Sequence, residues 1–167
     1  MVIALCLTAF ALTATAQKKK TTTKKTTPTA PTVNVNSAEI RAGADKISIQ
    51  IKNVSKFVFL LGGIARTIED LDKEAKTRKI SQASVDANNK NKQAVIQGIQ
   101  NIRAGLIALE EEFRTKPGLK LYAVRVDGIS NLVAGAEGQA AGGQITESGK
   151  TLLMVIERLS DALAALP

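Results

Sequence analysis

The chain has 167 residues, of which 44% are hydrophobic and 23% charged, and its formal net charge at pH 7 is +8. It contains no His and a single Cys, Cys6, which excludes an internal disulfide, a Cys–His pair and a Ser–His–Asp triad. The Glu-x-x-His motif of carboxylate-bridged metal bundles is excluded for the same reason. A chain of roughly 150 residues buries enough apolar surface to fold without a metal or a disulfide. We therefore expect one non-catalytic domain with no cofactor and no metal site.

Residues 1–16 (MVIALCLTAFALTATA) have the composition of an export signal. They carry no charged side chain and end in Ala14-Thr15-Ala16, the small-x-small pattern that signal peptidase accepts. The stretch is also shorter than the roughly 20 apolar residues that span a bilayer. These features predict a signal peptide over residues 1–16 and an exported mature protein, periplasmic or extracellular, that starts at Gln17. An uncleaved membrane anchor is the alternative.

Residues 17–35 (QKKKTTTKKTTPTAPTVNV) form a low-complexity segment rich in Lys and Thr. It has too little apolar surface to offset the entropy of ordering, so it is predicted to be a disordered linker. It has no aromatic side chain to stack on bases, which argues against nucleic-acid binding. The linker is then either a solvated spacer or a site of electrostatic contact with an anionic envelope surface. The candidate lysines for that contact are Lys18, Lys19, Lys20, Lys24 and Lys25.

Residues 36–167 carry four rows of apolar residues at alternating spacings of three and four, the periodicity of amphipathic helices. The first row comprises Ile40, Ala44, Ile47, Ile51, Val54, Val58, Leu61, Ala65 and Ile68, and its helix is expected to end near Thr77. The second comprises Val95, Ile99, Ile102, Leu106, Leu109 and Phe113. The third comprises Leu119, Tyr122, Val126, Ile129, Val133, Ala136 and Ala140, and the fourth Ile145, Leu152, Ile156, Leu159, Leu163 and Leu166. The rows predict an all-α domain, an antiparallel bundle of about four helices in which a long hairpin packs on a shorter one.

Turn-forming residues mark the breaks between the rows. The polar stretch Ser81–Gln93 is expected to hold the first turn, with a helical end to the stretch left open as an alternative. Pro117-Gly118 is expected to open the third helix, and Gly142-Gly143 to form the last turn. Leu121–Val126 contains β-branched residues, which leaves a strand as an alternative there. Gly62-Gly63 would break the first helix, but the apolar row continues in phase across the pair. We therefore favour a continuous or kinked helix.

The segment Phe57–Ala65 (FVFLLGGIA) is apolar on every helical face. Nine residues are too few to cross a bilayer, so we expect a helical turn surrounded by neighbours in the core. Insertion into a membrane after a rearrangement is the alternative.

The acidic residues are predicted to be solvated. The cluster Glu69–Glu74 has carboxylates at alternate positions, as in a calcium loop, but Ala75 follows where an EF-hand requires Gly. Two of its acids lie four residues before a lysine, the spacing of helix-stabilising pairs. The run Glu110–Glu112 fans out around a helix, so its side chains cannot converge on one ligand.

Two sets of glycines recur every seven residues: Gly98 with Gly105, and Gly128 with Gly135 and Gly142. Residues seven apart lie on one helical face, so each set is open to two interpretations. One is close approach of a neighbouring helix, and the other is coincidence in a chain rich in Gly and Ala.

The residue types present restrict the catalytic mechanisms that are open to this chain. A Ser–Lys dyad is the nucleophilic arrangement that remains, but Ser148 and Lys150 fall on different faces of a helix. The sequence therefore predicts an exported non-catalytic bundle with a binding or structural role, held at an anionic envelope surface by its basic tail or bound to a protein partner. The alternative is a membrane-active or pore-associated bundle. No stable transmembrane segment is expected in the mature chain.

Overall fold

The computed structural model describes residues 35–78 and 80–167, and all regular structure in these ranges is helical. The elements are α1 (Val35–Thr77), α2 (Gln82–Thr115), a 3₁₀ turn (Lys120–Tyr122), α3 (Ala123–Val126), α4 (Ile129–Ala141) and α5 (Ile145–Ala164). The all-α prediction is confirmed, and the alternative of a strand over Leu121–Val126 is wrong. The predicted signal peptide and the linker lysines lie outside the described residues. Val35, predicted as the last linker residue, is the first residue of α1.

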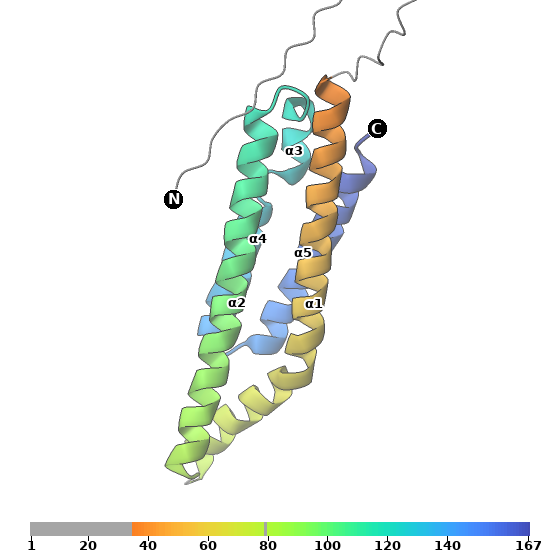
Figure 1. Cartoon of the computed structure of the whole chain (residues 1–167). Helices are drawn as coiled ribbons and strands as arrows, with labels where there is room; N and C mark the ends of the chain where they lie inside the picture. The colour runs from red at the N-terminus through yellow and green to blue at the C-terminus, as the bar shows by residue number, and fades with distance from the viewer. Residues whose placement is uncertain (1–34, 79) are drawn as a thin grey trace, which may run out of the picture. The chain divides into compact units, whose positions relative to one another are not determined.

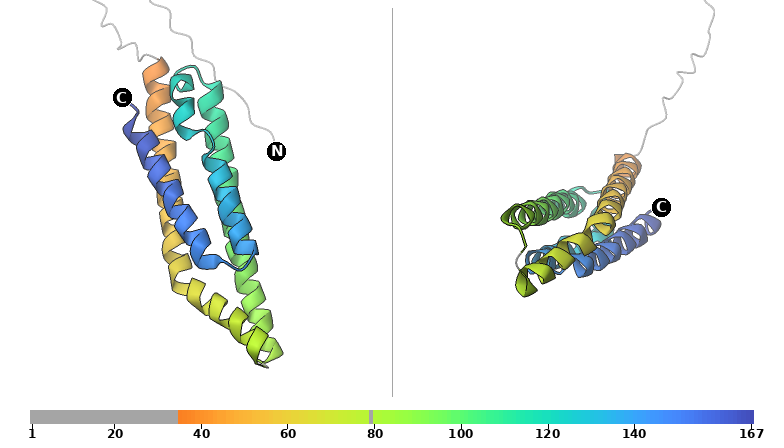
Figure 2. Two further views of the ribbon diagram at one scale, coloured as in Figure 1. Left: turned by 180° about the vertical axis from the view of Figure 1, so that it is seen from behind. Right: turned by 90° about the horizontal axis from the view of Figure 1, so that it is seen from below.

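The four main helices run in alternate directions around one core (Figure 1). Helices α1 and α2, of 43 and 34 residues, form the longer hairpin, and α4 and α5, of 13 and 20 residues, form the shorter one. The two hairpins pack against each other through contacts of α1 with α5 and of α2 with α4. The α1–α2 hairpin extends past the α4–α5 turn (Figure 2). This is the predicted arrangement of a long and a short hairpin.

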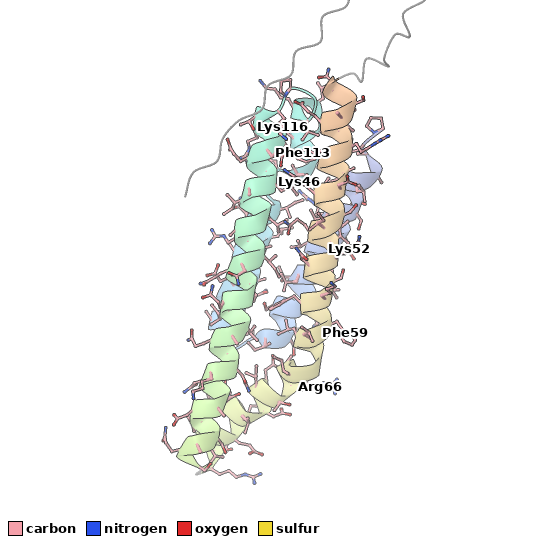
Figure 3. The ribbon with its side chains drawn as sticks, viewed as in Figure 1. Lys46, Lys52, Phe59, Arg66, Phe113 and Lys116 are labelled. Carbon is pink, nitrogen blue, oxygen red and sulfur yellow. The ribbon has the colours of Figure 1, made fainter. Side chains whose placement is uncertain are left out.

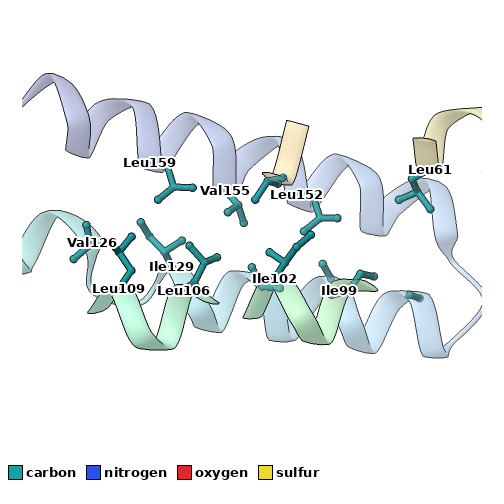
Figure 4. Close-up of a cluster of buried hydrophobic side chains, with 14 of the residues drawn as sticks. Leu61, Ile99, Ile102, Leu106, Leu109, Val126, Ile129, Leu152, Val155 and Leu159 are labelled. Carbon is teal, nitrogen blue, oxygen red and sulfur yellow. The ribbon is translucent and has the colours of Figure 1, made fainter. Parts of the chain in front are cut away.

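The predicted apolar rows form the core of the bundle. The side chains of Ile47, Val54 and Ile68 on α1 are fully buried, and so are Ile99 and Leu106 on α2. Figure 4 shows this cluster, whose labelled members are Leu61, Ile99, Ile102, Leu106, Leu109, Val126, Ile129, Leu152, Val155 and Leu159. The α5 row is wider than predicted, because that helix packs against both α1 and α4. It also buries Val155 and Ala162.

The first turn is much shorter than predicted. Helix α2 already begins at Gln82, so most of the polar stretch from Ser81 to Gln93 is helical. The reason is local, because the Ser81 side-chain oxygen accepts a hydrogen bond from the Ser84 backbone N–H at 3.1 Å and caps the helix. Further along, Asn88 is buried and donates to the Ile68 carbonyl at 3.2 Å, which ties the polar part of α2 to α1.

The third predicted helix is divided in two. Its apolar row is buried at Leu119, Val126 and Ile129, as expected. However, the chain turns between α3 and α4 at Gly128, whose φ of 79° lies in the left-handed region that favours glycine. The apolar spacing therefore predicts which side chains are buried, but it does not predict this turn.

Helix α1 is continuous but bent, as its uninterrupted apolar row predicts. In Figure 3 the bend lies between the labelled Phe59 and Arg66. Gly62 and Gly63 occupy this interval, and glycine pairs are a common cause of helix kinks. Both glycines are exposed, and a Cβ added to either would meet nothing within 4 Å.

Replacing both Gly62 and Gly63 with Ala is expected to stabilise the protein by about 1 to 2 kcal/mol, because a helix-interior Gly costs about 1 kcal/mol relative to Ala. Neither residue has a positive φ, so Ala can adopt the same backbone. The measurement is the free energy of unfolding in urea, followed by circular dichroism. The control is Gly98→Ala, whose new Cβ would overlap the Phe57 ring and so gain less or lose stability. A less stable double variant would show that the bend requires glycine.

Candidate functional site

The five lysines predicted to contact an anionic surface, Lys18, Lys19, Lys20, Lys24 and Lys25, lie outside the described residues. The candidate functional features of the bundle are its charged side chains, its clefts and its exposed apolar residues.

Carboxylates link the helices of the bundle to one another. The ones that contact another element are Glu39, Glu69, Asp72, Glu110, Glu112, Asp127 and Glu137. Three of them accept hydrogen bonds from backbone N–H groups in other elements. These are the contacts of Glu39 with Gly118 at 2.7 Å, of Glu69 with Thr146 at 2.8 Å, and of Glu110 with Ser130 at 2.8 Å.

The prediction that Glu110 is solvated is wrong. Its side chain is buried, and its two oxygens accept from the Ser130 N–H at 2.8 Å and from the Ser130 hydroxyl at 2.9 Å. These groups lie in the first turn of α4, which has no capping bond from a side chain of its own N-cap residue. Glu110 thus satisfies N–H and hydroxyl groups at a positive helix end. One signal pointed to this burial, since Glu110 lies four residues after the core residue Leu106.

The predicted solvated face of Glu69–Glu74 is also only partly correct. Glu69 caps the first turn of α5 through Thr146, and Asp72 pairs with Lys92 of α2 at 3.0 Å. The ion pair that lies within α1 joins Asp70 to Lys73 at 3.6 Å. Among the residues described, no three His, Cys, Asp or Glu side chains are grouped as a metal site.

Glu112 joins the two long helices near the end of α2. Its carboxylate pairs with Lys46 of α1 and with Lys116 at 2.5 Å, so it is not solvated as predicted. Burial opposes its ionisation, but the hydrogen bonds from Lys116 and Lys46 outweigh that effect and hold the pKa of Glu112 below its usual range. The same contact with Glu112 raises the pKa of Lys116.

One of the two glycine sets lies at a helix contact. Gly98 faces the Phe57 ring and Gly105 faces the Gln50 amide, so both make room for side chains of α1. In the other set, Gly128 provides the turn before α4, and Gly135 has nothing near a Cβ position. Close approach therefore explains the α2 glycines alone.

A cleft of about 700 Å³ lies between the α1–α2 hairpin and the α4–α5 turn. Its lining includes Asp72, Lys76, Lys92, Gln93, Gly142 and Gly143. The Asp72 and Lys92 charges neutralise each other, since these side chains form an ion pair. The cleft thus offers amide and lysine groups to solvent.

The outer side of α1 combines exposed apolar residues with cations. We define the α1 outer surface as Lys52, Lys56, Phe59, Leu60, Ile64 and Arg66. The side chains of Phe59, Leu60 and Ile64 are 82%, 66% and 41% exposed, respectively. The prediction that Phe57–Ala65 is surrounded by core neighbours is therefore only partly correct. Leu61 and Ala65 are buried, and Phe57 and Val58 pack against the core, but the other apolar side chains of the segment face solvent.

The cations of this surface have no acidic partners in the described part of the chain. Lys52, Lys56 and Arg66 form no ion pair there. No acidic residue occurs between Asp45 and Glu69 in the sequence. Figure 3 shows Lys52, Phe59 and Arg66 on the side of α1 that faces away from α2.

One described helix, spanning Asn36–Thr77, is long and apolar enough to cross a membrane by length and composition. Its most apolar 18-residue window has a mean hydropathy of 1.2. This helix also contributes Ile47, Val54 and Ile68 to the core of the bundle.

Comparisons with protein families, with curated proteins and with solved structures found no match to this chain.

Proposed function

We propose that this chain is an exported, non-catalytic helical-bundle protein with a binding or structural role, held at an anionic envelope surface by its basic tail. The tail contacts are Lys18, Lys19, Lys20, Lys24 and Lys25. The observation that carries the proposal is the distribution of charge in the bundle. Many carboxylates are engaged in contacts between elements, whereas Lys52, Lys56 and Arg66 stand unpaired on one side of α1. The tail and this side of the bundle thus attract the same kind of surface.

Export and the linker are part of the same proposal. Residues 1–16 act as a signal peptide that is removed after Ala16, and residues 17–34 act as a flexible linker between the surface and the bundle. Exported protein is expected to begin at Gln17. Intact-mass measurement tests this, and retention of residues 1–16 would instead support a membrane anchor.

Changing all five tail lysines to Gln is expected to abolish adsorption to anionic envelope material while leaving the melting temperature unchanged. Each lysine near such a surface contributes about 1 kcal/mol, and the attraction is screened beyond about 8 Å at physiological salt. The parent protein should therefore adsorb at low salt and be released by a few hundred millimolar salt, a rough figure from the same screening. Co-sedimentation with the envelope material measures the adsorption and its release by salt. Equal adsorption by the Gln variant would mean that the tail is only a spacer.

A second candidate is a membrane-active or pore-associated bundle. It is favoured by the hydropathy of α1 and by the exposure of Phe59 within it. In this case α1 would leave the bundle and insert. Dye leakage from vesicles, with protection of residues 57–65 from protease, would support this candidate. Intact vesicles with bound, protease-sensitive protein would rule it out.

A further inference from the structure

The apolar residues and cations of the α1 outer surface are arranged in two rows. Lys52, Phe59 and Arg66 are seven residues apart, so they share one helical face. Lys56, Leu60 and Ile64 are four apart and form an adjacent row. Apolar side chains thus lie at the centre of the surface, with cations on both sides along the helix. Membrane-contact surfaces combine apolar side chains in this way with Lys and Arg side chains that reach the headgroups.

The apolar part of this surface is large enough to matter. From their exposed fractions, Phe59, Leu60 and Ile64 present on the order of 400 Å² of side-chain surface. A stable protein–protein interface buries about 800 Å² on each partner, of which a little over half is apolar. Side chains also partition individually into a bilayer interface, so the area suits either occupant and the charges decide between them.

The charge of this surface favours a lipid bilayer over a second copy of the chain as its binding partner. Two copies related by a two-fold axis would bring the same surface together and place Lys52, Lys56 and Arg66 near their counterparts. Like charges in such a contact repel each other. An anionic bilayer instead attracts these cations, whose long side chains reach the headgroups while their stems stay on apolar surface.

The shape of the surface also favours a bilayer over a bound peptide. The clefts found between Asp72 and Gly143, between Glu69 and Glu147, and around Gly105 are lined by other residues, and the α1 outer surface lies at the bend of the helix. Peptide anchors generally require a pocket or a groove. We propose that the α1 outer surface is a membrane-contact site for anionic phospholipid, at which Phe59, Leu60 and Ile64 enter the headgroup boundary while the bundle stays folded. This inference deepens the proposed function and rests on it for the nature of the surface.

A tryptophan reporter tests the contact directly, because the chain contains no Trp. Phe59→Trp places a single Trp, excited selectively at wavelengths where Tyr does not absorb, at the proposed site in the full-length protein. The matched control is Leu121→Trp, since Leu121 is 86% exposed near the other end of the bundle. With vesicles of phosphatidylglycerol and phosphatidylcholine, the emission of the Phe59→Trp variant should shift to the blue and be quenched by bromine-labelled lipid. The emission of the Leu121→Trp variant, and that of both variants with phosphatidylcholine alone, should stay unshifted.

Paired substitutions measure the contribution of each kind of side chain. Phe59→Ser with Leu60→Ser should weaken vesicle affinity about tenfold or more, from the area removed. Its control, Leu121→Ser with Val124→Ser, removes equally exposed apolar residues elsewhere and should leave affinity unchanged. All four positions are exposed, so circular dichroism and the melting temperature should not change.

The charges are tested in the same way. Lys56→Gln with Arg66→Gln should weaken affinity about tenfold. Lys90→Gln with Arg158→Gln removes one exposed lysine and one exposed arginine elsewhere, and should have little effect.

The outcomes separate this inference from the proposed function. Adsorption that depends on the tail lysines, without any emission shift in the Phe59→Trp variant, would overturn the membrane-contact site and leave the proposed function standing. An emission shift in that variant, with adsorption that does not depend on the tail lysines, would support the membrane-contact site and overturn the proposed role of the tail. A shift that needs no vesicles and grows with protein concentration would overturn the inference in favour of a second copy. Dye leakage would overturn it in favour of insertion, and absence of any adsorption would overturn both proposals.

Discussion

Leu106→Asp is expected to destabilise the bundle by at least about 4 kcal/mol, because it forces an unpaired carboxylate into an apolar interior. Leu106 is fully buried on α2, within the cluster that Figure 4 shows. Domains of this kind are stable by about 5 to 15 kcal/mol, so the variant should be largely unfolded or close to it. Circular dichroism during urea and thermal unfolding measures the loss.

The adjacent residue provides the control for this substitution. Ile107 is 49% exposed, so its replacement by Asp puts the same charge one position further along α2 but in contact with water. Ile107→Asp should cost about 1 to 1.5 kcal/mol, well below the cost of Leu106→Asp, because only half of the Ile107 side chain is buried. Equal effects at the two positions would mean that the assignment of the buried face of α2 is wrong.

Glu110→Ala is expected to cost about 2 to 3 kcal/mol, since hydrogen bonds to a charged group are worth about 1.5 to 3 kcal/mol. The variant leaves the Ser130 N–H and hydroxyl, both buried, without the acceptors that the carboxylate supplies. It also removes the negative charge from the first turn of α4. The free energy of unfolding in urea measures the effect, and hydrogen exchange at the start of α4 should accelerate with it.

Glu111 offers the matched control, since it is the next residue and is exposed. Glu111→Ala should have an effect within about 0.5 kcal/mol. Glu110→Gln keeps one carbonyl acceptor, so its loss of stability should lie between those of Glu110→Ala and Glu111→Ala. If Glu110→Ala is as mild as Glu111→Ala, the carboxylate is not the cap of α4.

The buried carboxylates and the α1 outer surface belong to separate parts of the bundle. Substitutions at Glu110 or Leu106 act on helix packing and should lower the melting temperature. Those at Phe59 or Lys56 remove side chains that face solvent, and they should change adsorption alone. This separation makes the proposed surface testable in folded protein.

The α1 outer surface illustrates what the sequence leaves open. The apolar row of α1 passes through FVFLLGGIA at Val58, Leu61 and Ala65, so it predicts which side chains meet the core, but no polar residue in the segment marks the side that faces solvent. Only the packing of α1 against α2 and α5 determines that no neighbour covers Phe59.

The charged residues illustrate the same limit. From spacing alone, Glu110 belongs to a run of three solvated acids, and Asp72 to a helical pair with Lys76. Their partners in the bundle are Ser130 and Lys92, which lie 20 residues away along the chain. Such contacts depend on which helices become neighbours, and local periodicity carries no information about that.

The sequence by itself determined the helical class, the two hairpins and nearly all of the buried rows, because a repeat of three and four residues aligns apolar side chains on one face of a helix. It also determined that α1 continues across Gly62-Gly63, since the apolar row keeps its phase there. Only the tertiary structure decided that Glu110 is buried, that the chain turns at Gly128, and that Phe59 faces solvent. Each of these depends on the element packed alongside, since burial and capping are properties of pairs of elements and not of one helix.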